Sequence, residues 1–405
     1  MTTTEIRVDQ SVPPYGSYRA ERVRSMFNAT DDQATRFQLA LDVPLDFDGG
    51  DWQIGVVVGP SGSGKSSIGR QLWDGAAFYE AEGWPDDKPI VDAIAPDGDF
   101  NTVTAALASA GLGDVPVWLR PYSVLSMGQR FRADLARILA EAPDRVVFDE
   151  FTSVVDRQIA KVGAGAFAKA WRRTGGKAVL LSCHYDILDW VEPDWVIDTG
   201  TKQFQLAADK EGKTGTPWKR PRIDVEVRMG GWDLWPFFKP HHYLDIPRMI
   251  GAKCYVAFVD GEPVAHLGVA TKNVSTKDKR GRKVNAVEAR ASRLVVLPEW
   301  QGAGIGTRFL DHIAELQRTG QGVLPGRNMT TVFHTSHPQL CAALRRSKKW
   351  RQISGSLAGS NKAASTRTLR AAHARGSRKS TVGTGFGGHM RAVQGFRYYG
   401  PQEAS

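Results

Sequence analysis

A glycine-rich run near the start of the chain has residue types and spacing suited to holding phosphates. It follows the apolar residues IGVVV, precedes a helical stretch, and comprises Gly59, Pro60, Ser61, Gly62, Ser63, Gly64, Lys65, Ser66 and Ser67. The spacing is G-x-x-x-x-G-K-S, in which the glycines let backbone N–H groups turn toward phosphate oxygens. The lysine neutralises β- and γ-phosphate charge, and the serine hydroxyl binds Mg²⁺. The run therefore predicts a nucleoside triphosphate site with Ser66 as a metal ligand.

Three more polar clusters follow in the order that phosphoryl transfer needs. Residues 125–129 (LSMGQ) precede a helical run, Asp149 and Glu150 end the apolar strand RVVF, and His184 follows the strand AVLLS. A carboxylate beside a metal ligand can orient a water for attack on a phosphoryl group. Taken alone, Glu150 is equally a solvated strand-end acid and His184 a core histidine. Their order after the glycine-rich run favours the functional interpretation.

In order and spacing, these segments resemble the ABC-type ATPase family over roughly residues 20–205. The resemblance implies binding of ATP with Mg²⁺ and a role for each matching position. Asp149 would support the Mg²⁺ shell, Glu150 would polarise the attacking water, and His184 would sense the γ-phosphate.

The same resemblance implies a homodimer that forms with nucleotide, because the family completes each ATP site with a second chain. Ser126, Gly128 and Gln129 would close over the ATP of the other subunit, and Asp156 would lie in the loop that communicates across the dimer.

One feature departs from the family pattern. No glutamine occupies a loop between Ser66 and Ser126, where the family has one touching Mg²⁺, and Asp92 is a candidate substitute. That stretch has only about 60 residues, and no apolar run approaches the roughly 18 residues of a membrane helix. The sequence resembles the soluble ABC ATPases that act on DNA or the ribosome, so we expect no membrane contact and no transporter subunit.

A second glycine-rich turn lies in the C-terminal half. The apolar residues Val295, Val296 and Leu297 lead into Gln301, Gly302, Ala303, Gly304, Ile305 and Gly306, and an amphipathic helix follows. Glycines at a helix start expose N–H groups that can hold a pyrophosphate. The alternative is a turn that merely lets the helix pack closely on the strand.

With its preceding strand, this turn resembles the GNAT acyltransferase fold. The resemblance implies an acyl-CoA donor, with acetyl-CoA first among the candidates. Residues 295–297 would pair with pantetheine, and residues 301–306 would hold the pyrophosphate.

Upstream, His242 and Tyr243 followed by a DG hairpin are similar to the Mom-like branch of that fold, which modifies DNA bases and is associated with phage DNA. A histidine beside a tyrosine could serve as base and acid around an attacking amine. The alternative is a capping or loop histidine beside a core tyrosine. Glu288, before the strand at 289–296, is a further candidate base, or a plain exposed strand acid.

The positive charge of the chain is concentrated at its C-terminal end. From Cys341 onward there are 13 Lys and Arg against Glu403 alone, whereas the net charge of the whole chain is +10. Such cations bind phosphates without reading sequence, and Trp350 could stack on an unpaired base. The candidate nucleic-acid residues are Arg345, Arg346, Lys348, Lys349, Trp350, Arg351, Arg370, Arg375, Arg378 and Lys379. The alternative is a solubilising tail.

The fold class expected is α/β, with an ABC-type P-loop domain before a GNAT-like α+β domain and a basic tail. The boundaries are 1–206 for the ATPase, 207–222 for a linker, 223–354 for the acyltransferase, 355–390 for a basic low-complexity segment and 391–405 for a terminal strand and tail. Strands are expected at 53–58, 145–148, 178–181 and 195–198, then at 254–259, 263–270, 289–296 and 330–333, with a helix at 306–318. Three dispersed cysteines and an acidic, non-apolar N-terminus favour the reducing cytoplasm.

Three functions fit these observations. The first is an ATP-gated acyltransferase that modifies DNA. The second is an acyltransferase for a protein or small molecule with a regulatory ATPase, and the third is an ATP-dependent DNA-binding protein whose GNAT-like domain is not catalytic.

Overall fold

The computed structural model describes most of the chain as two compact units. The described residues are 4–11, 16–27, 36–73, 77–81, 83–208, 215–242, 248–249, 251–277, 283–356 and 393–401. The first unit comprises residues 1–98 and 121–222, and the second comprises residues 99–120 and 223–405. Among the described residues, no helix combines the length and apolar character that a membrane crossing requires.

The first unit is built on a five-stranded sheet in the order β4-β5-β3-β6-β7. Its strands are β3 (Ile54–Val58), β4 (Arg145–Phe148), β5 (Lys177–Ser182), β6 (Trp195–Asp198) and β7 (Gln203–Leu206). The first four pair in parallel and β7 is antiparallel at the edge. Every residue of β3 is buried, as expected for the centre of a parallel sheet. A separate hairpin pairs β1 (Thr4–Ser11) with β2 (Arg36–Val43).

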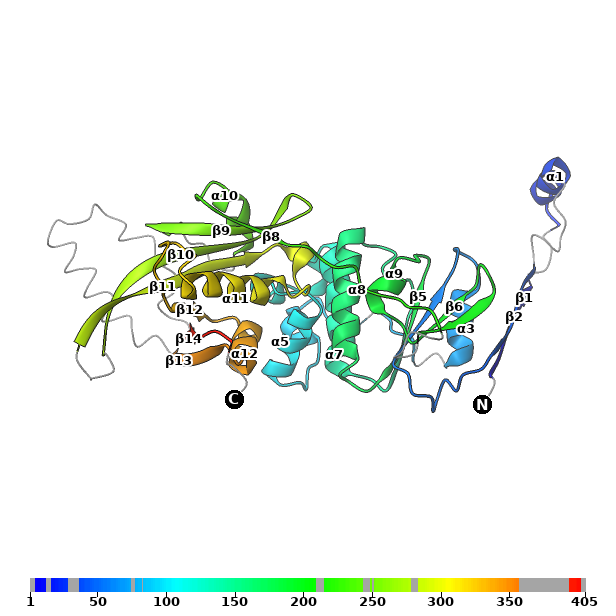
Figure 1. Ribbon diagram of the computed structural model, residues 1–405. Helices are drawn as coiled ribbons and strands as arrows, with labels where there is room; N and C mark the ends of the chain where they lie inside the picture. The colour runs from blue at the N-terminus through cyan, green and yellow to red at the C-terminus, as the bar shows by residue number, and fades with distance from the viewer. Residues whose placement is uncertain are drawn as a thin grey trace. The chain divides into compact units, whose positions relative to one another are not determined.

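The helices of the first unit connect these strands (Figure 1). They are α1 (Tyr18–Phe27), α3 (Lys65–Leu72), α4 (Ile90–Ala93), η2 (Tyr122–Val124), α7 (Met127–Glu141), α8 (Arg157–Trp171) and α9 (Ile187–Val191). The phosphate-loop helix α3 follows β3, and α8 connects β4 to the parallel strand β5. This alternation of strands and helices confirms the parallel α/β organisation predicted for residues 51–200.

The second unit is built on a seven-stranded sheet in the order β13-β14-β12-β11-β10-β9-β8. Its strands are β8 (Glu226–Gly230), β9 (Ala252–Val259), β10 (Glu262–Lys277), β11 (Lys283–Val296), β12 (Thr331–Thr335), β13 (Trp350–Ser356) and β14 (Val393–Tyr398). Only the β11–β12 pair is parallel. The last strand, β14, inserts between β12 and β13, so the expected return of the C-terminus as a strand is confirmed.

Helix α11 (Ile305–Arg318) packs its apolar side on this sheet (Figure 1). Phe309, Leu310 and Ile313 are buried against Ala289 and Ala291 of β11. The small alanines let the helix approach the strand closely. The other helical elements are α5 (Phe100–Ser109), α6 (Val115–Trp118), α10 (Trp235–Phe238), η3 (Lys239–His241), η4 (Pro298–Trp300) and α12 (Pro338–Arg346).

The division into units differs from the sequence-based boundaries in one respect. Residues 99–120 lie between the glycine-rich loop and Ser126 in the chain, yet they group with the seven-stranded sheet of the second unit. The end of the expected linker is also anchored, because Arg220 donates to the carbonyl of Trp190 and pairs with Glu192 in the first unit. The expected low-complexity segment falls almost entirely outside the described residues.

Candidate functional sites

The glycine-rich loop has the form of a phosphate cradle. It leaves β3, and α3 begins at Lys65 behind Gly64, which has a φ of 80°. The Lys65 ammonium is buried, at 7% exposure, and donates to the carbonyls of Gly59 and Pro60 at 2.9 and 2.8 Å. The first N–H groups of α3 have no partner within the helix and carry its positive end. A buried lysine and the N–H groups at the start of α3 lie around one loop, and together they fit the triphosphate of ATP.

The strand order brings the other predicted catalytic residues to the same sheet edge. Because β4, β5 and β3 are parallel neighbours, their carboxyl ends carry Asp149, His184 and the phosphate loop side by side. Glu150 has a φ of 53°, and its N–H donates to Asp149 Oδ1 at 2.8 Å. Phe151 N–H then donates to the carbonyl of Leu181 at 2.8 Å, which fixes the turn after β4 against β5. Glu150 is exposed, so its carboxylate is accessible to solvent.

The predicted signature residues begin helix α7. Ser126 is its N-cap, and its hydroxyl and the Gln129 side chain form a reciprocal capping box. Gly128 faces α8, where an added Cβ would lie 2.8 Å from the side chain of Ile159. Asp156 caps α8 by accepting from the N–H of Gln158. These local contacts hold the segment in shape, and Ser126 remains exposed for a partner.

Asp92, the candidate replacement for the missing glutamine, lies on the four-residue helix α4 and is exposed. Its assignment as a metal-shell residue stays a prediction. No group of three or more His, Cys, Asp or Glu side chains close enough to hold a metal occurs in the described part of the chain.

The second site begins where two parallel strands separate. β11 pairs with β12 only over Ala289–Ala291, whereas it continues to pair with β10 as far as Val296. From Ser292 onward, no described strand pairs with β11 on the side that faces β12, and we call this side the free edge of β11. Two carbonyls of this stretch have side-chain partners, because that of Arg293 lies 3.2 Å from His266 Nδ1 and that of Val296 accepts from Gln301 Nε2. Arg293, in this stretch, has a φ of 60° and marks an irregularity in the strand. A free strand edge of this kind can pair with an extended amide chain such as pantetheine.

The turn after β11 forms the floor of a cavity. Leu297 N–H donates to Val264, η4 follows, and α11 starts behind Gly304, whose φ is 78°. An added Cβ at Gly304 would meet nothing within 4 Å, so this glycine borders open space. The first N–H groups of a helix have no partner within the helix, so those of α11 could bind an anion. The free edge and the helix start together fit an acyl-CoA-type donor.

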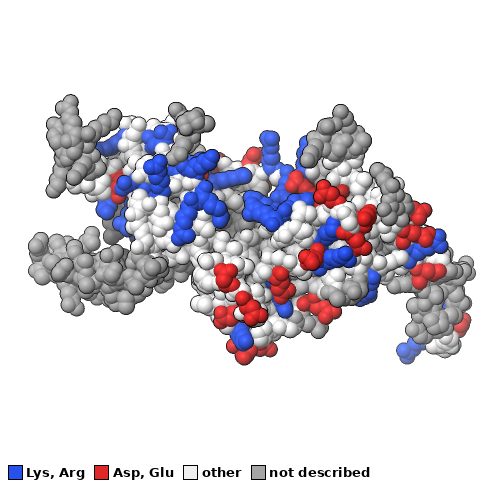
Figure 2. All heavy atoms as spheres, turned by 90° about the horizontal axis from the view of Figure 1, so that it is seen from below, with Lys and Arg blue, Asp and Glu red and all other residues white. Residues whose placement is uncertain are grey.

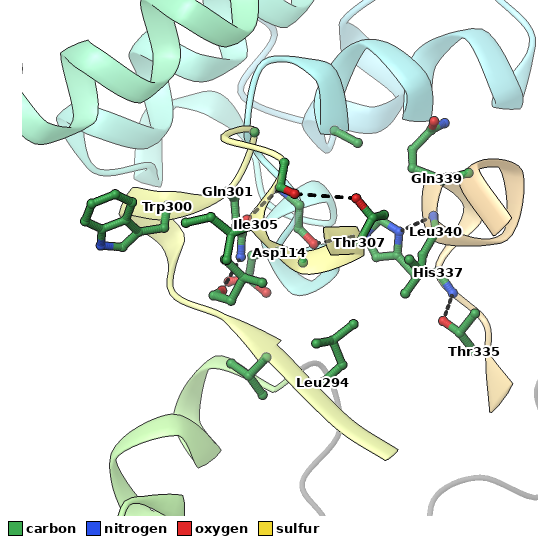
Figure 3. Close-up of a pocket in the computed structure, with 18 of the residues that line it drawn as sticks. Asp114, Leu294, Trp300, Gln301, Ile305, Thr307, Thr335, His337, Gln339 and Leu340 are labelled. Atoms are coloured by element: carbon green, nitrogen blue, oxygen red, sulfur yellow. Dashed lines mark hydrogen bonds between the residues drawn. The ribbon is translucent and has the colours of Figure 1, made fainter. Parts of the chain in front are cut away.

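The cavity, which we call the β11 cavity, has a volume of about 420 Å³ (Figure 3). Most of the residues predicted to contact the donor line it, namely Val295, Val296, Gln301, Gly302, Gly304, Ile305 and Gly306, whereas Leu297 and Ala303 do not. Leu294 and Thr307, which were not predicted, line it as well. His334, Thr335, His337 and Leu340 line it from β12 and α12. The remaining wall comes from Ala108, Ser109, Gly113 and Asp114, which belong to the segment 99–120.

Of the acceptor-side candidates, His242 lies on the cavity wall and Glu288 does not. His241 and His242 both line the β11 cavity, and the His242 ring lies edge-on to Trp235 at 5.9 Å. Tyr243 lies outside the described residues. Glu288 is buried at 7% exposure, and its Oε2 accepts from Arg397 at 3.0 Å. It is absent from the cavity wall, because that wall begins further along β11 at Ser292.

His334 is a cavity residue that the set of predicted catalytic residues omitted. It follows Phe333 on β12, and its buried Nδ1 has no hydrogen-bond partner among the described residues. Burial lowers the pKa of His334, Arg290 and Lys272 lower it further, and Glu288 opposes them. The ring is therefore neutral at pH 7 and can accept a proton. The sequence signal for His334 was its position directly after the expected strand at 330–333.

His266 supports the irregular part of β11 from the neighbouring strand. It is fully buried, its Nδ1 lies 3.2 Å from the carbonyl oxygen of Arg293, and its ring lies between Trp232, Trp235 and Phe238. Burial lowers the pKa of His266 to about 4. A neutral ring that donates from Nδ1 would hold this carbonyl in place.

We expect the buried His266 to make stability fall in acid. The unfolded chain binds a proton at an ordinary histidine pKa of about 6.5, whereas the folded protein resists it until about pH 4. Its stabilising contribution is thus complete above pH 6.5 and is lost as the pH falls toward 4, by about 2 kcal/mol at pH 5. Denaturant unfolding at pH 7.5 and 5 should show this loss, and His266→Gln should remove most of it. An equal pH dependence in both proteins would contradict the assignment.

The described basic residues after Cys341 are exposed or partly exposed, and they differ in whether they have a charged partner. Arg345, Arg346, Lys348 and Arg351 are exposed, and Arg346 also lines the β11 cavity. Lys349 is paired with Asp311 at 3.0 Å. Arg370, Arg375, Arg378 and Lys379 lie outside the described residues. On the face drawn in Figure 2, Lys and Arg side chains gather over the transferase unit.

The prediction that Trp350 could stack on an unpaired base is wrong. The indole is only 3% exposed, packs edge-on to Tyr398 at 5.0 Å, and donates to Asp311 at 2.7 Å. It is a core residue at the start of β13, so it cannot stack on a base in this fold. Tyr399, which is 44% exposed and lies under the guanidinium of Arg351, is an aromatic side chain of this region that remains accessible.

Comparisons with known proteins bear on both units. The family model described as acetyltransferase (GNAT) domain matches residues 251–344. The cytochrome c biogenesis ATP-binding export protein CcmA of Paramagnetospirillum magneticum is 31% identical over 167 residues, which cover 33% of this chain and 75% of that protein. CcmA of Rhodospirillum rubrum is 33% identical over 161 residues, covering 33% and 68%. A solved post-hydrolysis dimer of the ATP-binding cassette MJ0796 bound to ADP and Pi is 15% identical, covers 42% of this chain and 91% of its own, and has a TM-score of 0.34.

The chain therefore belongs to the ABC-type ATPases through its N-terminal part, and it carries a GNAT acetyltransferase domain in its C-terminal part. Both are classes of enzyme domain. ATP with Mg²⁺ is the ligand implied for the first domain, and an acyl-CoA is the donor implied for the second. The predicted fusion of these two domains is confirmed.

Proposed function

We propose that this protein is an ATP-dependent acyltransferase that modifies an amino group of a nucleic-acid base. The donor is an acyl-CoA, with acetyl-CoA the first to test, and the acceptor is DNA, as in the Mom-like branch. ATP closes two chains into a homodimer, and we place the reaction in the cytoplasm. The observation that carries the proposal is that a cavity suited to acyl-CoA has an exposed arginine, Arg346, in its own wall.

Different residues of the ATPase domain have separate roles in phosphoryl transfer. Lys65 leaves its two loop carbonyls to meet the phosphates. Ser66 and Asp149 would hold Mg²⁺, which would neutralise charge on the phosphates. Glu150 orients the attacking water, and His184 contacts the γ-phosphate from the end of β5. Ser126, Gly128 and Gln129 of the partner subunit cover the ATP from the other side.

The transferase residues position a direct transfer. The free edge of β11 holds the pantetheine arm, and the start of α11 at Gly304 and Ile305 holds the pyrophosphate. The acceptor nitrogen attacks the thioester carbonyl, a C–N bond forms, the C–S bond breaks, and the CoA thiolate leaves. His334 accepts the proton from the nitrogen, because it is neutral and lies in the cavity. His242 is the second candidate from the opposite wall.

Charge around the cavity supports a polyanionic acceptor. Arg345, Arg346 and Lys348 are exposed at the end of α12 and just beyond it. On the sheet, exposed Arg290 and Lys272 lie close enough to His334 to lower its pKa. Cations on both sides of a candidate base would hold phosphates while a base enters. Exocyclic amino groups of adenine, cytosine and guanine are the available nucleophiles.

We expect nucleic-acid binding to weaken steeply with salt. Each phosphate contact contributes a slope of about −0.9 to log K against log salt concentration on duplex DNA. Arg346→Ala together with Lys348→Ala should weaken binding and flatten that slope by about 2. Fluorescence anisotropy with a labelled duplex measures both. An unchanged slope would contradict a phosphate role for this pair, and Lys349→Ala, which removes an internally paired cation, is the matched comparison.

A transfer assay tests the proposal directly. Purified protein is incubated with ATP, Mg²⁺, acetyl-CoA labelled in the acetyl group, and DNA, and the DNA is then digested and counted. Label in a nucleoside supports the proposal. Label confined to protein would replace it with protein acylation, and donor binding without any transfer would favour a non-catalytic GNAT domain.

A further inference from the structure

The segment 99–120 starts and ends in the ATPase part of the chain but folds with the transferase. Asp99 caps α5 by accepting from the N–H groups of Asn101 and Thr102, and α5 packs against α12 of the transferase sheet. The segment is joined at both ends to the first unit, through Gly98 and Pro121. It is thus a covalent connection from the ATPase into the wall of the β11 cavity.

Gly113 is the point where this segment contacts the transferase machinery. Its N–H donates to Gln301 Oε1 at 2.8 Å, and Gln301 Nε2 donates to the carbonyl of Val296 at 3.0 Å. Val296 belongs to the free edge of β11, and Gln301 opens the turn that leads to α11 (Figure 3). One side chain therefore ties the segment to both parts of the proposed donor site.

His337 holds the other side of Gly113. Its Nδ1 accepts from the N–H of Leu340 as the N-cap of α12, which leaves the proton on Nε2. Nε2 then donates to the carbonyl of Gly113 at 3.2 Å. Trp118 packs edge-on to the His337 ring at 5.7 Å, and burial lowers the pKa of His337, so the ring stays neutral. Both backbone groups of Gly113 are thus bonded to transferase side chains.

Just after the C-terminal end of the segment, Tyr122 is held against helix α7. Tyr122 stacks on Trp84 with ring centres 4.7 Å apart, and its hydroxyl donates to Asp134 Oδ2 at 2.9 Å. Asp134 lies on α7, whose N-cap is Ser126. Only three residues lie between Tyr122 and Ser126, so a movement of α7 would pull on the segment 99–120, which ends two residues before Tyr122.

We propose that the segment 99–120 transmits the nucleotide state of the ATPase to the acyl-donor site through Gly113, Gln301 and His337. Repositioning of α7 when ATP closes the dimer shifts Gly113, and Gln301 then changes how it holds Val296 and the turn before α11. Donor binding acts back on the ATPase by the same contacts, because coupling between two binding sites is reciprocal. The identity of the donor rests on the proposed function, whereas the transmission itself does not.

Hydrogen–deuterium exchange on the full-length protein tests the transmission without a donor. The probe is ATP with Mg²⁺ added to Glu150→Gln protein, and the readout is exchange in peptides covering 108–118 and 297–306. We expect ATP to change exchange rates in both peptides by threefold or more. Lys65→Ala with ATP should match the nucleotide-free protein. No change in 297–306 in a protein shown to bind ATP would overturn the inference.

The matched variant is His337→Asn. Asparagine is a good helix N-cap and its side chain is too short to reach the Gly113 carbonyl, so α12 is kept while the contact is removed. We expect ATP binding to persist and the ATP-dependent change in 297–306 to disappear. A change as large as in the parent would show that this contact transmits nothing.

Free CoA then separates this inference from the proposed function. Titration of ATP with and without saturating CoA should show a fivefold or larger change in ATP affinity, reduced in His337→Asn. CoA that binds without altering ATP affinity would overturn the coupling. A failure of CoA to bind would overturn the proposed donor site, and the exchange result would still decide the transmission.

Discussion

Glu150→Gln protein will bind ATP, form a stable dimer and hydrolyse ATP at least 100-fold more slowly than the parent protein. The amide cannot accept a proton from the attacking water, and general-base assistance is worth about 10²–10⁴ in rate. Binding persists because Lys65 and the first N–H groups of α3 belong to a different element from the turn after β4, which carries Glu150. Steady-state phosphate release gives the rate, and analytical ultracentrifugation with and without ATP gives the dimer.

Glu192→Gln is the matched control for this experiment. Glu192 is also a glutamate in the left-handed region, with a φ of 49°. It lies before the amino end of β6, whereas Glu150 lies after the carboxyl end of β4 in the same sheet. The substitution makes the same change of charge in a similar backbone conformation, so its ATP hydrolysis should stay within about twofold of the parent. Normal turnover in Glu150→Gln would show that another group activates the water.

Gly304→Val protein will lose binding of acyl-CoA by 30-fold or more and keep its ATP hydrolysis. Valine at a φ of 78° is strained by about 1–3 kcal/mol, and its side chain points into the open space at the start of α11. The valine side chain occupies the space in front of the N–H groups of α11 that would hold the pyrophosphate. Isothermal titration with acetyl-CoA measures the affinity, and phosphate release measures the ATPase.

Gly326→Val is the matched control for the donor site. Gly326 has the same φ of 78° and the same open space for a Cβ, but it lies outside the β11 cavity. Its backbone strain is therefore equal, whereas its effect on the donor should be absent. Equal loss in both variants would mean that strain in the unit, and not a blocked pyrophosphate site, is responsible.

The sequence predicts the architecture of both sites because each is made by contiguous residues. Residues 59–64 connect β3 to α3, which begins at Lys65, and residues 301–304 lead into α11, which begins at Ile305, as expected from the glycines and the flanking apolar runs. β4 and β6 begin and end at the predicted residues, since short apolar runs bounded by polar residues define buried parallel strands.

The parts that sequence reasoning missed depend on tertiary pairing. Gly113 and Asp114 belong to the β11 cavity only because α5 packs on α12, and no motif in 99–120 signals that contact. Burial raises the pKa of Asp114, although Arg120 and His241 oppose this, so its environment also differs from that of an ordinary loop acid. Trp350 lies within a run of cations but begins a strand whose partner, β14, is more than 40 residues later in the chain.

The central claim is most directly tested by the nucleosides of DNA from a bacterial host that expresses this protein. The DNA is digested completely and analysed by mass spectrometry, beside DNA from cells expressing Gly304→Val and Gly326→Val. We expect a new nucleoside with the parent protein and with Gly326→Val, absent with Gly304→Val, whose added mass identifies the transferred group. Identical nucleoside profiles from all three, with the proteins folded and acetyl-CoA bound by the parent, would contradict acylation of DNA bases.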